Sequence, residues 1–176
     1  MPPYRVRLVK GTKTNAPADV ITGAGFGGFI ASQRFVAALE RSNLRGVERW
    51  EPVDIQGYSD YDGDPLSSPV APNRKFLLAI LPTPTTRAKW NEMHPVFKGD
   101  LMGCQLCGRH RSVDSYRGVV VDETSWTGAD IFEPIGLGGK FIVTDAFAEF
   151  IVSGEFTGVP LVPAAEFVPF RAGQAY

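Results

Sequence analysis

The sequence has few cysteines and histidines, no excess of either charge and no long apolar run. Only two of its 176 residues are cysteine and two are histidine, which excludes a scaffold held by several disulfides. Its 18 basic and 19 acidic residues leave a net charge of -1, whereas a nucleic-acid binder normally carries a basic excess. No stretch approaches the roughly 18 apolar residues of a membrane helix, and Met1–Arg5 lacks the apolar core of a secretory signal. We therefore expect a cytoplasmic protein that engages neither nucleic acid nor a membrane.

Glycine and proline, by contrast, are abundant. The chain contains 19 glycines and 14 prolines, and 44% of its residues are hydrophobic. This composition predicts one sizeable core, few long helices, and short strands joined by irregular turns.

Two distant stretches of the chain repeat one another. Residues 27–47 and 139–159 match at a constant offset of 112. Glycine and apolar positions recur in register: Gly27, Phe29, Ile30, Phe35, Gly46 and Val47 return as Gly139, Phe141, Ile142, Phe147, Gly158 and Val159. Upstream, with one residue inserted, Ala18–Ile21 is echoed by Ala129–Phe132. A match in both residue type and register predicts an ancestral duplication.

Each copy predicts a strand that runs into a helix. Phe29–Ala31 and Phe141–Val143 are short apolar runs typical of strands. Ser32 and Thr144 follow them at the position of a helix N-cap, where a side-chain oxygen accepts from the free N–H groups of the first turn. A helix is therefore expected to begin after each of these two hydroxyl residues.

The two predicted helices each have one apolar face. Phe35 and Leu39 lie four residues apart, as do Phe147 and Ile151, so each pair shares one side of its helix. We expect that side to pack against the core.

Glycines predict how each copy continues. Gly46 and Gly158 are expected to adopt a positive φ, to end the helical segment and to turn the chain. Val47–Ile55 and Val159–Phe167 then resume as extended chain interrupted by proline. Each copy thus predicts the order strand, helix, glycine turn, strand.

The fold class expected from these patterns is α+β, in a single domain of residues 1–176 with an internal duplication. Units 18–55 and 129–167 are the two copies, and the inserted region 56–128 carries a cysteine-containing loop. The inserted region also predicts two further strands, Phe76–Leu81 and Val119–Val121.

Several segments of the second half resemble a known family. They are the lead-in Val121–Phe132, the strand and cap Phe141–Thr144, the turn Phe156–Val159, and Cys104–Gly108, which reads CQLCG. Together they resemble the myxobacterial double-CXXCG-motif proteins, a family of bacterial immunity proteins, over about residues 100–165. This chain carries one CXXCG motif instead of two, so a zinc site made of four cysteines is excluded.

The resemblance implies a cytoplasmic, antitoxin-like protein. Its partner would be the cognate toxin domain of a secreted effector used in interbacterial competition, and it would cover the active site or substrate surface of that toxin. The family supplies no catalytic residues to carry over, and histidines that could activate a nucleophile are scarce. No enzymatic activity is therefore expected. The alternative, from a different class, is a zinc-ribbon-like regulatory or nucleic-acid-associated module.

Cys104 and Cys107, together with His110 and His94, are the candidate metal ligands. Thiolates and imidazoles suit zinc, and the only histidines of the chain lie near its only cysteines. The spacing matches no standard zinc finger, and the alternative is a pair of free thiols packed in a loop. No other cofactor is expected, because the glycine-rich segment Gly23–Gly28 precedes a predicted strand, whereas a dinucleotide fingerprint precedes a helix.

A tyrosine-bearing acidic segment is the candidate partner-binding site. It consists of Tyr58, Asp60, Tyr61, Asp62 and Asp64. The glycine within it is misplaced for a calcium-binding loop. In an immunity protein, these rings and carboxylates would occupy a basic cleft of the toxin. The alternative is a solvated acidic turn.

Overall fold

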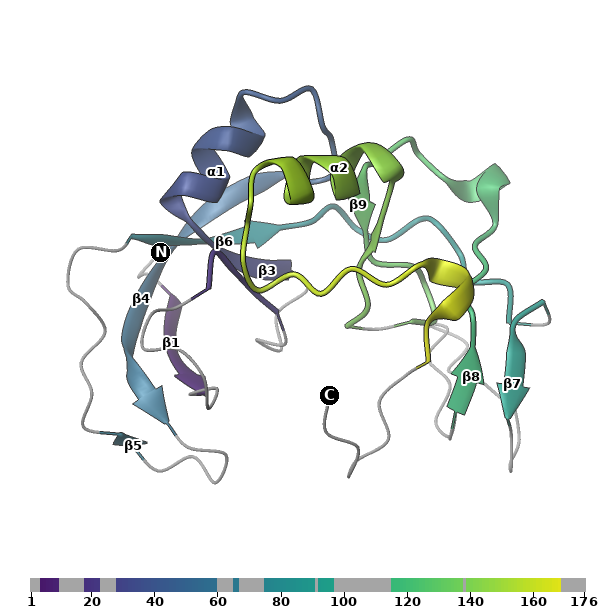
Figure 1. The fold of residues 1–176 in the computed structure, drawn as a ribbon, viewed down its shortest axis with the longest axis horizontal. Helices are drawn as coiled ribbons and strands as arrows, with labels where there is room; N and C mark the ends of the chain where they lie inside the picture. Colours follow the sequence, from purple (N-terminus) through teal and green to yellow (C-terminus); the bar gives the residue numbers. More distant parts are fainter. Residues whose placement is uncertain are drawn as a thin grey trace. The chain divides into compact units, whose positions relative to one another are not determined.

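The computed structural model describes residues 4–9, 18–22, 28–59, 65–66, 75–90, 92–96, 115–137 and 139–168. These residues form an α+β fold, with two α-helices, one six-stranded sheet and two pairs of strands (Figure 1). The fold class predicted from the sequence is confirmed. The chain divides into two compact units, the first comprising Met1–Leu81 and Glu149–Val159, the second Pro82–Ala148 and Pro160–Tyr176.

The first unit is built on the six-stranded sheet. Its main path has the order β1 (Tyr4–Val9), β4 (Arg49–Ser59), β6 (Phe76–Ile80), β3 (Gly28–Ser32) and β2 (Val20–Ile21), and β5 (Pro65–Leu66) pairs with β4. Strand β1 runs parallel to β4, and the other pairings are antiparallel. The sequence predicts β3, β6 and most of β4. Strand β1 was not predicted, although its sequence YRVRLV alternates with the period of a strand.

Helix α1 (Gln33–Glu40) packs on β3 and β6 (Figure 1). Its buried residues are Phe35, Val36 and Leu39, which confirms the predicted apolar face. Phe29 of β3 meets Phe35 edge-on, with ring centroids 5.9 Å apart. The next residue of the strand, Ile30, belongs to a separate cluster with Phe76 and Leu78. Since successive strand residues point to opposite faces, both faces of β3 are covered.

Gly28 begins β3 at a place where only glycine fits. It pairs with Ile80 of β6. A Cβ atom added to Gly28 would overlap the carbonyl oxygen of Ala79. The backbones of the two strands therefore approach too closely here for any other residue.

The second unit contains two short antiparallel pairs of strands. One joins β7 (His94–Val96) to β8 (Ser115–Arg117), and the other joins β9 (Ile131–Phe132) to β10 (Ile142–Val143). Two 3-10 helices, η1 and η2, span Glu123–Ser125 and Ala164–Glu166. One core cluster of this unit consists of Met93, Tyr116 and Leu137, packed against Ala88, Trp90, Val119, Val120 and Phe167.

Helix α2 (Asp145–Ser153) begins in the second unit and ends in the first. Phe147 and Ile151 are buried, as their spacing predicts. Neither helix in the part of the chain that the structure describes has the length and apolar character of a membrane span.

Two predicted strands are wrong. Val159–Phe167 contains η2 and no strand, and its residues from Pro160 to Glu166 are exposed. Prolines 160 and 163 have no N–H for a strand ladder, which explains the difference. Val119–Val121 also forms no strand: β8 ends at Arg117, and Val121 makes an isolated antiparallel bridge to Ala88. The N–H of Val119 instead donates to the carbonyl of Ala164, at 2.8 Å.

The predicted glycine turns are confirmed in conformation but not in position. Gly46 and Gly158 have φ of 131° and 86°. However, the helices before them end at Glu40 and Ser153. Several residues therefore separate each helix end from its glycine, and the glycines turn the chain without capping the helices.

Candidate functional site

The start of α1 is fixed by a pair of side chains, Asp19 and Ser32. Pairing of Val20 with Ala31 places β2 beside the end of β3. The N–H of Ser32 donates to the carbonyl of Asp19 at 2.7 Å, and its hydroxyl donates to Oδ1 of Asp19 at 2.8 Å. The same hydroxyl oxygen accepts from the N–H of Phe35 at 3.3 Å, which makes Ser32 the N-cap.

The start of α2 repeats this arrangement. Ile131 pairs with Val143. The N–H of Thr144 donates to the carbonyl of Asp130 at 3.0 Å, and its hydroxyl donates to Oδ1 of Asp130 at 2.8 Å. The N–H of Phe147 donates to the Thr144 hydroxyl at 3.4 Å. The two copies therefore share both strand register and capping geometry up to the first turn of the helix, and both predicted caps are confirmed.

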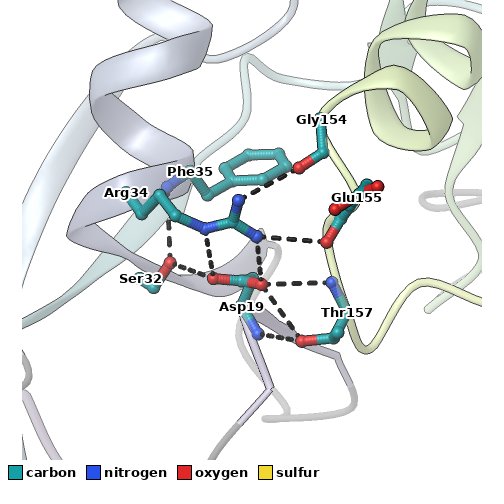
Figure 2. A network of polar contacts seen from close by, with 7 residues as sticks. All are labelled: Asp19, Ser32, Arg34, Phe35, Gly154, Glu155 and Thr157. Carbon is teal, nitrogen blue, oxygen red and sulfur yellow. Dashed lines mark hydrogen bonds and ion pairs between the residues drawn. The ribbon is translucent and has the colours of Figure 1, made fainter.

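The copies differ two residues after the cap. Arg34 in the first copy corresponds to Ala146 in the second. The guanidinium of Arg34 donates to both oxygens of Asp19, from Nε at 3.3 Å and from Nη2 at 2.7 Å (Figure 2). This is the fork geometry in which arginine binds a carboxylate most strongly.

The same guanidinium also binds the chain that follows α2. It donates to the carbonyl of Gly154 at 3.0 Å and to that of Glu155 at 3.1 Å (Figure 2). It lies over the ring of Phe156, 4.5 Å from the centroid. A cation beside the last carbonyls of a helix is favourable, since those groups carry partial negative charge. Arg34 therefore stabilises the end of α2 from outside that helix.

Thr157 completes the network on the other side of Asp19. Its N–H and hydroxyl both donate to Oδ2 of Asp19, at 3.2 and 3.1 Å. Its hydroxyl oxygen accepts from the N–H of Asp19 at 3.0 Å, and its carbonyl accepts from the N–H of Val20, also at 3.0 Å. In the first copy the position of Thr157 is held by Arg45. The two copies thus contribute different residues to one network.

The Asp19 carboxylate is held in its ionised form. Hydrogen bonding to Arg34 is the main cause that keeps the pKa of Asp19 well below its usual range, aided by Thr157 and Ser32 and opposed by partial burial. A carboxylate of such low pKa has little affinity for a proton, and both of its oxygens are engaged. The network therefore serves as a structural junction and is unsuited to general acid–base chemistry.

The cysteine-containing site predicted from the sequence lies largely outside the described residues. This applies to Cys104, Cys107 and His110. His94 is placed in β7, where it pairs with Arg117 of β8. Among the residues that the structure describes, no three histidine, cysteine, aspartate or glutamate side chains gather as metal ligands would. The zinc hypothesis stays a prediction.

The acidic segment is described only at its beginning. Tyr58 lies in β4 and pairs with Leu66 of β5. Asp60, Tyr61, Asp62 and Asp64 lie outside the described residues. The expected contact with a partner stays a prediction as well.

Sequence reasoning missed the network of Asp19, Arg34 and Thr157. The sequence could have indicated the bond between Asp19 and Ser32, because an aspartate and a hydroxyl residue recur at these positions in both copies. No signal pointed to Thr157, which is 138 positions from Asp19.

Comparisons with models of known protein families, with characterised proteins and with solved structures find no match for this chain.

Proposed function

We propose that the protein is a cytoplasmic immunity protein, which binds the toxin domain of a bacterial effector and covers its active site or substrate surface. The observation that carries the proposal is the resemblance of 121–132, 141–144 and 156–159 to double-CXXCG immunity proteins. These segments supply β9, β10, the cap of α2 and the turn after it. The resemblance therefore follows residues with defined structural roles and is not spread over loops alone.

The electrostatics of the junction agree with a binding role. Asp19 is the acidic residue with the most strongly lowered pKa in the described part of the chain, and its oxygens are bonded to the protein itself. Enzymes use perturbed groups that can exchange protons near neutral pH. The polar interactions of Asp19 instead join separate segments of the first unit.

The acidic segment is the part that we expect to reach the toxin. Residues 60–64 connect β4 to β5, and the antiparallel pairs Tyr58–Leu66 and Ser59–Pro65 hold the two ends of that connection. Toxins that act on nucleic acids or other anions have basic clefts, and an acidic segment with a tyrosine complements such a cleft. Charge complementarity of this kind raises the association rate and selects the partner.

The proposal predicts that a toxin gene lies beside the gene for this protein, and it is tested with the toxin found there. Co-expression of its C-terminal toxin domain with the full chain is expected to restore growth and to yield a stable complex on purification. Absence of both rescue and complex would contradict the proposal. Retention on heparin with salt-dependent DNA binding would instead favour the nucleic-acid-associated alternative.

The contact residues are tested with two triple variants of equal charge. Changing Asp60, Asp62 and Asp64 to alanine is expected to weaken toxin binding by about tenfold or more, as loss of an interface hot spot does. The control changes Glu40, Glu123 and Glu149, which are exposed, to alanine and should leave affinity unchanged. Equal affinities for the two variants would exclude the acidic segment as the contact.

A further inference from the structure

A segment from the second copy of the repeat completes the first unit. We call residues Glu149–Val159 the strap; they belong to the first unit, although Ala148 before them and Pro160 after them belong to the second. The rings of Phe150 and Phe156 in the strap contact the ring of Phe35, with centroid distances of 5.6 and 4.9 Å. The strap thus covers the apolar residue that anchors α1.

The strap also covers the end of the sheet. Strand β2 is the last strand of the sheet path, and the carbonyl of Thr157 accepts from the N–H of Val20 at 3.0 Å. Gly158 approaches so closely that a Cβ on it would overlap the carbonyl of Val20. Unpaired groups on an edge strand invite pairing with other chains, so the strap protects this edge.

The turn inside the strap is unfavourable by itself. The N–H of Phe156 donates to Ile151 O at 3.2 Å and that of Glu155 to Val152 O at 3.1 Å, the pattern of a Schellman turn. Glycine is usual at the left-handed position of such a turn, but Glu155 occupies it with φ of 50°. An acidic side chain at a helix C-terminus is also disfavoured.

Arg34 offsets both of these features while the strap is docked. It binds the carbonyls of Gly154 and Glu155, and its positive charge attracts the Glu155 carboxylate. The side chain of Arg34 is 55% exposed. The polar part of the contact that secures the strap is therefore accessible to water, and such contacts open more readily than buried apolar ones.

We propose that the strap opens and closes on the first unit as a separate local unit, with the Arg34–Asp19 pair as its latch. Opening exposes the Phe35 ring and the N–H of Val20 while leaving the ladder of β3 and β6 intact. It requires the loss of a few polar contacts, of the contacts of Phe150 and Phe156 with Phe35, and of the burial of Ile151. This is less than global unfolding requires.

The test compares Arg34→Gln with Arg49→Gln in the full chain. Both guanidiniums lie beside carboxylates and are almost equally exposed, at 55% and 53%. The two changes therefore remove the same charge from equally exposed ion pairs, but only Arg34 binds the strap. Amide hydrogen exchange is followed by NMR. In Arg34→Gln, exchange at Val20 and Thr157 is expected to accelerate by about tenfold or more, with β3 unchanged. Arg49→Gln should not alter exchange at Val20 or Thr157.

A second variant separates the latch from general damage. Thr157→Val removes the hydroxyl bonds of the strap to Asp19 but keeps Arg34 and its ion pair. It is expected to accelerate exchange at Val20 without affecting β3. The proposal is overturned if Arg34→Gln and Arg49→Gln give the same exchange pattern. It is equally overturned if Thr157→Val accelerates every amide of the first unit together or unfolds that unit.

Discussion

Asp19 and Thr157 bind each other through both backbone and side chain, although 138 positions separate them in the chain. The N–H of Asp19 donates to the threonine hydroxyl at 3.0 Å, and that hydroxyl donates to Oδ2 of Asp19 at 3.1 Å. Reciprocal bonds of this kind fix the relative orientation of two segments more firmly than a single bond. Each segment comes from a different copy of the repeat, so the two copies are not independent modules placed in a row.

Asp19→Asn is expected to lower the free energy of unfolding by about 2 kcal/mol at pH 7, because charge-assisted bonds to Arg34 and Thr157 are lost. The pKa of Asp19 is lowered in the folded protein. Its stabilisation is therefore complete above the unfolded pKa of about 4 and is lost as the pH falls through the folded pKa. Urea unfolding at pH 7 and below pH 4 measures the free energy of unfolding of both proteins. The difference between the variant and the parent should shrink as the pH falls. A difference that does not depend on pH would contradict it.

Ser32→Ala and Thr144→Ala are each expected to cost about 1 kcal/mol of stability, because each removes a helix N-cap with the same geometry. Thermal unfolding measured by circular dichroism reports the loss. Ser153→Ala serves as the control, since its hydroxyl donates to a carbonyl within α2 from an exposed position, and its effect should stay within about 0.5 kcal/mol. A large loss in only one of the two cap variants would show that the repeated motif has unequal energetic weight.

Glu155→Gly is expected to stabilise the protein by up to about 1 kcal/mol, because glycine adopts the left-handed conformation without strain. The attraction between Glu155 and Arg34 is lost in the variant, which reduces the gain. Glu149→Gly makes the same chemical change inside α2 and should destabilise by about 1 kcal/mol. Denaturant midpoints of the two variants should therefore move in opposite directions, and movement in the same direction would refute the strain argument.

Gly28→Ala is expected to destabilise the protein by about 3 kcal/mol or more, because the new Cβ overlaps the carbonyl of Ala79 in the neighbouring strand. Gly139→Ala is the informative comparison. Gly139 has φ of 75°, but an added Cβ meets no atom within 4 Å, so only the conformational cost of about 1–2 kcal/mol applies. Soluble yield and the urea midpoint distinguish the two variants. Equal losses of stability in both would mean that β3 and β6 can move apart to accommodate the new Cβ.

Local patterns in the sequence predicted local structure well. Ser32 and Thr144 were identified as caps because a hydroxyl residue directly precedes each amphipathic segment, and both caps form. The spacing of Phe35 from Leu39 and of Phe147 from Ile151 predicts a buried helix face, and both phenylalanines are buried. Each of these features depends on residues within a few positions of one another, so a sequence pattern can specify it.

Features that depend on distant partners were not predictable. In the sequence, Arg34 resembles any exposed helical residue. Its bonds to Gly154 and Glu155 depend on the tertiary structure, which brings these distant residues beside it. The strand predicted at 159–167 does not form. Similarity to the first copy predicts it, but two prolines in this segment lack the N–H groups that a strand needs. Sequence similarity between the copies thus predicts the structure that they share and misleads where their residues differ.

The dependence of the first unit on residues 149–159 also constrains when that unit can mature. During translation, β2, β3 and α1 leave the ribosome more than a hundred residues before the segment that covers them. Until that segment is synthesised, the edge of β2 and the ring of Phe35 have no cover from it. A chain that is interrupted between the two copies would therefore retain all six strands of the sheet but leave the edge of β2 and the ring of Phe35 without this cover.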